Sequence, residues 1–250
     1  FDNWLTGLIP DNVEIQNRAV CLSVERQKDC FQITYEKDGE TTQVYSRYIV
    51  GADGANSIVR RSLFKDFKIR VYLAVQQVFS DAHDTPFYSC IFDPDITDSY
   101  AWGLTKDESF IFGGAFDIKT GKKDFEALKD KLSDYGFRLD NPQKTEACLV
   151  LRPFGPRNFC YGGNGAFLIG EAAGFISPSS LEGISYAIDS GYILSECLNK
   201  SAEPDRAYRK ATRGIRLKLT AKYLKRPFMY NPLSRKIIMK SGLSSVKVIK

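Results

Sequence analysis

Two short stretches of small residues, each placed after a buried strand, constrain the fold of this chain more than any other feature. The first is AFLIGEAAG at 166–174, which leads through SPSSLEGI at 177–184 into a helix. The second is GADGANSIVR at 51–60, which follows a strand at 48–50. Small side chains let a flat ligand approach the backbone, and the amides at the start of a helix attract negative charge. The pattern predicts a platform for an anionic cofactor.

Taken together, the two stretches resemble the Asp-Gly and Gly-Asp fingerprints of FAD-dependent oxidoreductases with the p-hydroxybenzoate hydroxylase architecture. That group includes flavin monooxygenases and geranylgeranyl reductases, and the segments 51–63 and 167–187 look most like its CbrA-like branch. The resemblance implies an α/β (α+β) fold, with a partial FAD/NAD(P)-binding domain, an inserted antiparallel-sheet substrate domain and a C-terminal helical segment. It assigns 1–63 and 158–200 to the FAD-binding part, 64–157 to the substrate domain and 201–250 to basic C-terminal helices.

One expected element is missing from the sequence. Proteins of this group open with a strand, a Gly-x-Gly-x-x-Gly turn and a helix that hold the ADP half of FAD, and no such segment occurs here. We therefore expect the chain to be the C-terminal portion of a larger flavoprotein, preceded by on the order of 100 residues.

The resemblance gives roles to residues in both turns. Glu171 stands where the family usually has Asp and is expected to accept a hydrogen bond from an FAD hydroxyl, the alternative being an ordinary surface turn. Asp53 is expected near the FAD pyrophosphate with Arg60 supplying positive charge; alternatively, Asp53 caps a helix at 56–63. The predicted cofactor-binding residues are Gly51, Asp53, Gly54, Arg60, Gly170, Glu171, Ala172, Ala173, Gly174, Pro178, Gly183 and Ile184.

The start of the second helix is expected to face the isoalloxazine ring through Pro178, Glu182, Gly183 and Ile184. A helix N-terminus there would stabilise an anionic reduced flavin without an acid or base side chain, so no catalytic residue is assigned. Glu182 has a plainer interpretation as a first-turn acid that complements the helix dipole. Gly174 stands where hydroxylases often have His, which favours the reductase branch.

The segment YAWGLTK at 100–106 resembles the Tyr-x-Trp-x-Phe-Pro-Lys substrate signature of geranylgeranyl reductases, although Leu104 and Thr105 depart from it. Tyr100 and Trp102 alternate onto one face of a strand, where they either wall a pocket for an apolar ligand or belong to the plain core. The predicted substrate-binding residues are Tyr100, Trp102 and Lys106.

Periodicity and turn residues predict the surrounding elements. A β-meander is expected within 12–50, with Asp38-Gly39 as a hairpin turn. Its strands are expected at 13–15, 20–25, 31–35 and 42–45, and sheet strands follow at 71–79, 87–92, 100–104 and 109–115. Helices are expected at 124–135, at 181–198, beyond Asp205 as far as Arg226-Pro227, and at 234–240.

Charge is distributed unevenly. The segment 200–250 has 15 Lys and Arg against two acids, whereas the rest of the chain has 20 bases and 28 acids. The basic helix from Arg206 to Arg226 suits an anionic membrane surface or packing over the substrate pocket, and packing is favoured. No nucleic-acid-binding module accompanies the charge. With one His and no Cys-x-x-Cys spacing, no metal site is expected. We expect a cytoplasmic protein, peripheral to the membrane if the basic helix binds it.

These observations lead to one main functional hypothesis and two alternatives. The main one is an FAD-dependent oxidoreductase that reduces carbon–carbon double bonds of an isoprenoid or other lipid-like substrate, with NAD(P)H as a possible electron donor. The alternatives are a flavin monooxygenase acting on an aromatic or polyene, and a non-catalytic fragment that binds a lipid or a partner.

Overall fold

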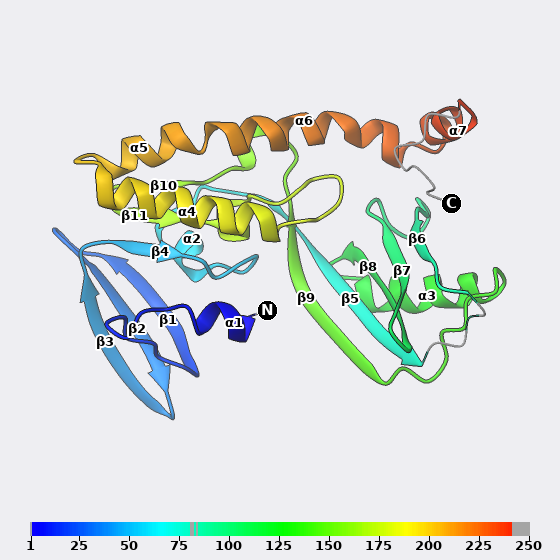
Figure 1. Cartoon of the computed structure of the whole chain (residues 1–250), viewed down its shortest axis with the longest axis horizontal. Helices are drawn as coiled ribbons and strands as arrows, with labels where there is room; N and C mark the ends of the chain where they lie inside the picture. The colour runs from blue at the N-terminus through cyan, green and yellow to red at the C-terminus, as the bar shows by residue number, and fades with distance from the viewer. Residues whose placement is uncertain (1, 81–82, 84, 242–250) are drawn as a thin grey trace.

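The N-terminal part of the chain is an antiparallel meander. The computed structural model describes residues 2–80, 83 and 85–241. After the short helix α1 (Asp2–Thr6) come β1 (Ala19–Arg26), β2 (Phe31–Lys37) and β3 (Glu40–Ser46), paired in that order (Figure 1). Asp38 and Gly39 have φ of 52° and 85°, which confirms the predicted hairpin turn. The strand predicted at 13–15 is wrong: Val13 and Ile15 are exposed, and no described strand pairs with them.

A second, small sheet contains the two strands that precede the small-residue turns. Its order is β10 (Gly162–Gly163), β11 (Ala166–Leu168) and β4 (Ile49–Gly51), with β11 parallel to β4. The helix α4 (Ile184–Lys200) packs nearby, and its Tyr186 and Leu194 join buried clusters with Leu168 and Phe167 of β11. This buried layer holds the two turns in place.

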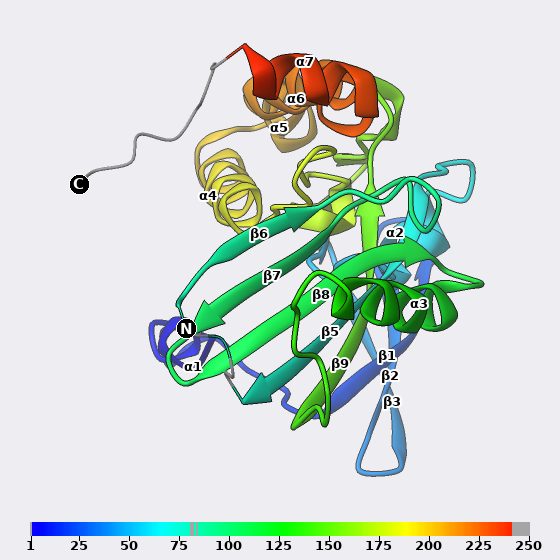
Figure 2. The same ribbon diagram turned by 90° about the vertical axis from the view of Figure 1, so that its right-hand side faces the viewer.

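The third sheet has five antiparallel strands in the order β6-β7-β8-β5-β9. Their bounds are β5 (Arg70–Ser80), β6 (Tyr88–Ile91), β7 (Ala101–Lys106), β8 (Ser109–Asp117) and β9 (Lys144–Arg152). The helix α3 (Gly121–Ser133) lies across one face, where Phe125 and Leu128 pack against Phe112 and Phe116 (Figure 2). The opposite face carries an open hollow beside Trp102, and its predicted use as a substrate wall stays a prediction.

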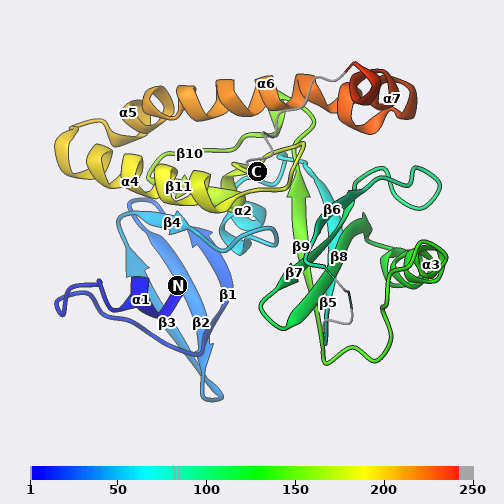
Figure 3. The same ribbon diagram turned by 45° about the vertical axis from the view of Figure 1, so that its right-hand side comes forward.

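The C-terminal helices run along one edge of the molecule. The helices α5 (Pro204–Ala211), α6 (Arg213–Tyr230) and α7 (Pro232–Lys240) extend over α4 and toward the five-stranded sheet, while the meander lies on the other side (Figure 3). The predicted helix end at Pro227 is wrong, because α6 continues to Tyr230. Contacts on both sides of the proline hold this last turn: Arg226 pairs with Asp98, and Tyr230 donates a hydrogen bond to the carbonyl of Ser179.

A buried tyrosine ties these helices to the strand before the first turn. The hydroxyl of Tyr208 in α5 donates to the carbonyl oxygen of Leu168 over 2.9 Å, and the side chain is fully buried. We expect Tyr208→Phe to lower the free energy of unfolding by about 1–2 kcal/mol, because the buried carbonyl loses its donor. Tyr192→Phe, at a position 67% exposed on α4, should leave it unchanged. Urea denaturation of both variants checks this; equal stabilities would show that the bond contributes nothing.

Candidate functional site

The two small-residue turns leave the same edge of one sheet. Gly51 at the end of β4 lies opposite Leu168 at the end of β11, and the amide of Ile169 donates to the carbonyl of Gly51 over 3.0 Å. Because β4 and β11 are parallel, both turns begin at the carboxyl ends of these strands. Ligands bind at that edge in open α/β sheets. The structure therefore brings together two motifs that lie far apart in the sequence.

Arg60 connects the two turns directly. Its guanidinium donates to the carbonyls of Gly54 and Ala55 in the second turn and to that of Ala172 in the first, the last over 2.8 Å. The residue is 5% exposed. Burial lowers the pKa of its guanidinium, and the nearby negative charge of Asp53 raises it in part. With these bonds made, Arg60 acts first as a clamp between the motifs. Its predicted contact with the cofactor stays a prediction.

Asp53 caps the helix that follows it. Its carboxylate accepts hydrogen bonds from the amides of Ile58 and Val59, at 2.6 and 3.3 Å, at the start of α2 (Ile58–Leu63). The helix begins two residues later than the sequence predicted, because Ser57 is its N-cap. The capping alternative thus describes the structure. Asp53 remains exposed, so a second contact with a ligand is open to it.

The glycines of both turns have packing reasons as well. A Cβ on Gly51 would lie 2.6 Å from the Leu168 side chain, and one on Gly170 would lie 2.9 Å from Ala187 of α4. Gly174 has φ of 77°, and its Cβ would come within 2.3 Å of the Asn158 carbonyl. Gly54, with φ of 66°, faces open space. The first three positions admit no side chain without movement, whatever they bind.

The residues between Gly170 and Gly174 form a turn of 3-10 helix. Ala172 and Ala173 are fully buried, so a ligand at this edge meets backbone and not their methyl groups. Glu171 points toward the five-stranded sheet, where its Oε1 accepts a hydrogen bond from the amide of Leu151 in β9 over 2.7 Å. Burial raises the pKa of Glu171, while the Leu151 amide and the charge of Arg60 lower it in part. The carboxylate therefore links the turn to the substrate sheet.

The loop that leads into α4 is held at three consecutive carbonyl oxygens. Arg152 of β9 donates to Pro178 over 3.1 Å, Tyr230 of α6 to Ser179 over 2.8 Å, and Tyr100 to Ser180 over 2.7 Å. These donors come from the five-stranded sheet and the C-terminal helices. They fix the position of the loop, and its expected contact with the flavin ring stays a prediction.

The start of α4 gives this edge its electrostatic character. The helix begins at Ile184, three residues later than predicted, and its N-cap Gly183 supplies no side-chain hydrogen bond to the first turn. The first-turn amides of a helix have no partner within the helix, so they attract an anion or a polarised oxygen. Ile184 beside them is 69% exposed. Glu182 lies at this helix start as well: its carboxylate pairs with Lys222 at 3.4 Å and accepts a hydrogen bond from the Ser185 hydroxyl over 3.3 Å.

An open hollow of about 520 Å³ lies on the face of the five-stranded sheet opposite α3. Ala74, Gln76, Trp102, Ala147 and Cys148 contribute to its lining, together with Glu146. The indole of Trp102 donates to Gln76 over 3.2 Å. It fits because Gly113 lies opposite in β8, where a Cβ would approach the ring to 2.7 Å. The predicted wall around Trp102 thus faces a cavity.

The remaining substrate residues occupy different places. Tyr100 lies beside Trp102, with ring centroids 5.6 Å apart, and burial raises the pKa of its hydroxyl. Lys106 is exposed at the far end of β7, paired with Ser109 at the hairpin, and it is absent from the described lining of the hollow. The structure brings together Tyr100 and Trp102 but not Lys106, because the strand carries the lysine past the hollow.

Sequence reasoning missed a cluster of arginines around Asp98. Arg70 contacts this carboxylate at 2.8 Å and Arg226 at 3.4 Å, and Tyr72 donates to it over 2.8 Å. Arg152 donates to the Asp98 carbonyl over 2.8 Å and is fully buried, with Nη2 making no hydrogen bond among the described residues. The only signal in the sequence was a charged residue ending the apolar strand before Pro153. The cluster joins the sheet to α6.

The edge formed by these residues fits the flavin half of an FAD. Its helix start without a side-chain cap, its exposed Ile184 and the hollow beside Trp102 lie on the side where the resemblance places the ring. Gly183 and Ile184 would hold the ring there, whereas Pro178 is buried, and Asp53 and Gly54 belong to the neighbouring turn. The bound group would supply hydride chemistry at this edge.

Comparison with known proteins agrees with this fit. The model of the FAD binding domain family matches residues 11–95. Protein CbrA of Escherichia coli strain CFT073 is 48% identical over 251 residues, covering 100% of this chain and 69% of that protein. CbrA of Shigella sonnei is also 48% identical, and the match covers 71% of its length.

Solved structures share the fold at low sequence identity. The p-nitrophenol 4-monooxygenase PnpA of Pseudomonas putida is similar with a TM-score of 0.67 and 17% identity, covering 94% of this chain and 64% of that one. A geranylgeranyl bacteriochlorophyll reductase-like protein of Thermoplasma acidophilum has a TM-score of 0.62 and 17% identity, covering 83% and 56%. The predicted fold class is confirmed.

The fold and the matched segment point to one class: residues 11–95 match the FAD binding domain model, and the fold is the one found in a monooxygenase and in a reductase-like protein. Within that class, the identity and coverage show that the chain belongs to the CbrA family. The predicted resemblance is thereby confirmed, and the match to the FAD binding domain model supports FAD as the cofactor.

The raised pKa of Glu171 predicts a pH-dependent stability. The folded protein favours the neutral form of this carboxyl, so its pKa is higher in the folded than in the unfolded chain, where it is near 4.5. The carboxyl therefore stabilises the fold fully at a pH below 4.5, and this contribution is lost as the pH rises through the folded pKa. Glu171→Gln should therefore be more stable than the natural chain at neutral pH, by on the order of 1 kcal/mol, and equal to it below 4.5. Urea denaturation across this pH range measures the difference.

The matched control is Glu25→Gln, which changes an exposed carboxylate of β1 and should shift stability little at any pH. A Glu171→Gln protein that is less stable at neutral pH, by a margin that grows with pH, would contradict the burial argument. It would show instead that the ionised carboxylate stabilises the turn.

Proposed function

We propose that the protein reduces carbon–carbon double bonds of an isoprenoid or other lipid-like substrate, using FAD held at the edge where β4 and β11 end. The observation that carries this proposal is the apolar hollow beside Trp102. It lies on the same sheet whose Tyr100 and Arg152 hold the loop before α4. Hydrogen bonds thus connect the proposed substrate wall to the proposed cofactor loop.

Bound reduced FAD would supply the two electrons of this reaction as a hydride, and solvent would supply the proton that completes the saturated product. The chain's own residues position the reactants. Trp102, held by Gln76, presents a flat apolar surface for the chain of the substrate, and the first turn of α4 favours negative charge at its end. NAD(P)H as the electron donor stays a prediction.

The position of Gly174 supports reduction over hydroxylation. Hydroxylases of the resembled group often have His there, and this backbone leaves no room for a side chain, since a Cβ would lie 2.3 Å from the Asn158 carbonyl. The likeness to a p-nitrophenol monooxygenase is one of fold. Monooxygenation is therefore the second candidate, and the mass of the product distinguishes the two.

The test uses the purified flavin-loaded protein, a reductant and polyprenyl substrates, with mass spectrometry of the product. Reduction adds a pair of hydrogen atoms for each double bond, whereas hydroxylation adds one oxygen atom. Trp102→Ala should lower kcat/KM by about tenfold or more, since the substrate loses an aromatic contact surface worth roughly 1–3 kcal/mol. Trp102→Phe should recover most of that loss.

Tyr45→Ala is the matched control, because this aromatic residue is 63% exposed on the meander and should leave kcat/KM unchanged. Flavin content is measured for each variant, so that lost cofactor is not mistaken for lost substrate binding. Products that gain oxygen, or full activity of Trp102→Ala with saturated products, would contradict the proposed reaction or the proposed wall, respectively.

A further inference from the structure

The outer side of α6 carries an apolar stripe that no described part of the chain covers. Leu217, Leu224 and Phe228 are 59%, 65% and 57% exposed. Their spacing of seven and four residues puts them on one side of a helix. The opposite side is the one that packs, through Ile215 and Leu219. Leu224 lies at the border of this stripe, because it also lines a hollow of about 340 Å³ together with Phe92 and Pro94.

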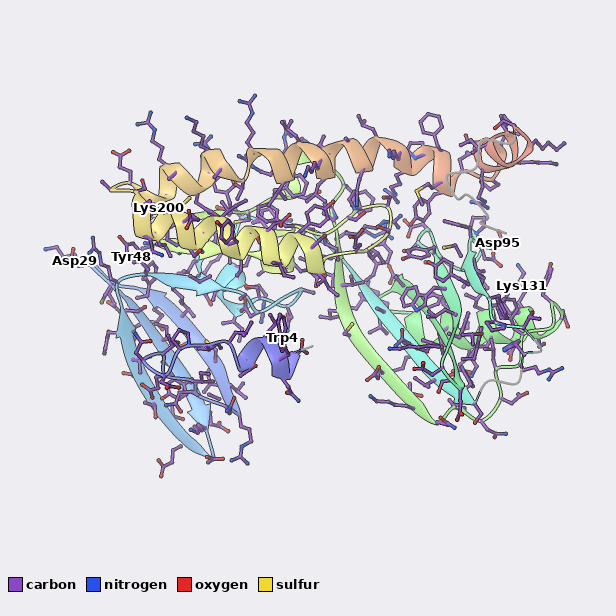
Figure 4. All side chains as sticks on the ribbon, viewed as in Figure 1. Trp4, Asp29, Tyr48, Asp95, Lys131 and Lys200 are labelled. Atoms are coloured by element: carbon purple, nitrogen blue, oxygen red, sulfur yellow. The ribbon has the colours of Figure 1, made fainter. Side chains whose placement is uncertain are left out.

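Basic side chains border this stripe. Lys218 and Lys225 follow Leu217 and Leu224 by one position each, and Arg213 precedes the stripe; all three are exposed. Along 204–240 the sequence has twelve Lys and Arg and a single acid, Asp205. Figure 4 shows side chains that end in nitrogen projecting from the outer edge of α5 and α6. We call Arg213, Leu217, Lys218, Leu224, Lys225 and Phe228 the α6 outer face.

The other three basic residues of α6 are bonded to groups of the protein itself. Lys222 pairs with Glu182, Arg226 pairs with Asp98, and Arg216 donates to the carbonyl of Arg209. The helix thus separates two sets of cations, one bonded to the body of the protein and one exposed beside the apolar stripe. An arrangement with exposed cations flanking exposed apolar side chains is typical of helices that lie in the interface of an anionic membrane.

We infer that the α6 outer face docks on an anionic phospholipid surface, with Leu217, Leu224 and Phe228 entering the headgroup region. A second copy of the same face is disfavoured, because it would bring like charges together. Among the described residues, no helix has the length and apolar character needed to cross a bilayer. The inference therefore concerns contact with the surface. It does not depend on the proposed reaction, since lipid binding is measured without substrate.

The adjoining helix α7 extends the same edge of the molecule (Figure 1). Its Leu233 and Ile237 are 68% and 61% exposed, and Lys236 and Lys240 are exposed beside them. A docked α6 would bring this helix close to the same surface. The meander lies on the other side of the molecule, away from these helices (Figure 3).

The experiment is co-sedimentation of the purified protein with vesicles of phosphatidylcholine alone or mixed with phosphatidylglycerol, at low and high salt. We expect binding to the mixed vesicles, weakened by salt. The triple variant Leu217→Gln, Leu224→Gln, Phe228→Gln should bind them about tenfold or more weakly, because Gln keeps helix propensity and removes the apolar contact. The double variant Lys218→Gln, Lys225→Gln should lose most of the response to phosphatidylglycerol.

The matched control is Val20→Gln, Leu22→Gln, Tyr45→Gln, which removes three comparably exposed apolar side chains from the meander and should bind like the natural chain. Circular dichroism confirms that each variant is folded. The inference is overturned by absence of binding to phosphatidylglycerol vesicles, or by equal binding of the triple variant. It is also overturned if light scattering shows a dimer that the triple variant abolishes, since the face would then join two copies.

Discussion

The parallel pairing of β4 with β11 is the constraint on which the rest of this structure depends. Only because Gly51 lies opposite Leu168 do the two small-residue turns leave one edge, where Arg60 can bridge them through the Ala172 carbonyl. A sheet of two three-residue strands and one two-residue strand is too short to be stable alone. It is maintained by the buried side of α4 and by Tyr208, which donates to the carbonyl at the end of β11.

A second set of interactions joins that edge to the substrate sheet. Glu171 accepts the amide of Leu151, and Arg152 and Tyr100 donate to carbonyls of the loop before α4. In each bond a side chain from one unit meets backbone of the other, so the geometry does not depend on the precise side chains that line the hollow. This arrangement keeps the cofactor edge fixed while leaving Trp102 and its neighbours open to a ligand.

Several residues that the sequence predicts to bind the cofactor also stabilise the fold. Asp53 caps α2, Arg60 clamps two turns, and Gly170 and Gly174 allow close approach of neighbouring backbone. A residue type that suits a ligand also suits a tight turn, because both require small side chains and satisfied backbone groups. The match to the FAD binding domain model supports a cofactor role for this part of the chain, and the packing gives these residue types a second, structural role.

The sequence by itself determined most strands and helices and the two turns, because periodicity and small-residue runs are local signals. It was wrong about a strand at 13–15, and it predicted one helix beyond Asp205 where the structure has α5 and α6. It placed the inserted sheet, the Asp38-Gly39 hairpin and α4 to within a few residues, and it missed the continuation of α6 past Pro227. That helix end is decided by Asp98 and Ser179, residues distant in the chain. Tertiary structure alone decided that Lys106 lies beyond the hollow, that Arg152 is buried among aromatic rings and that α6 exposes an apolar stripe. These outcomes depend on which surfaces meet, and no local pattern specifies that.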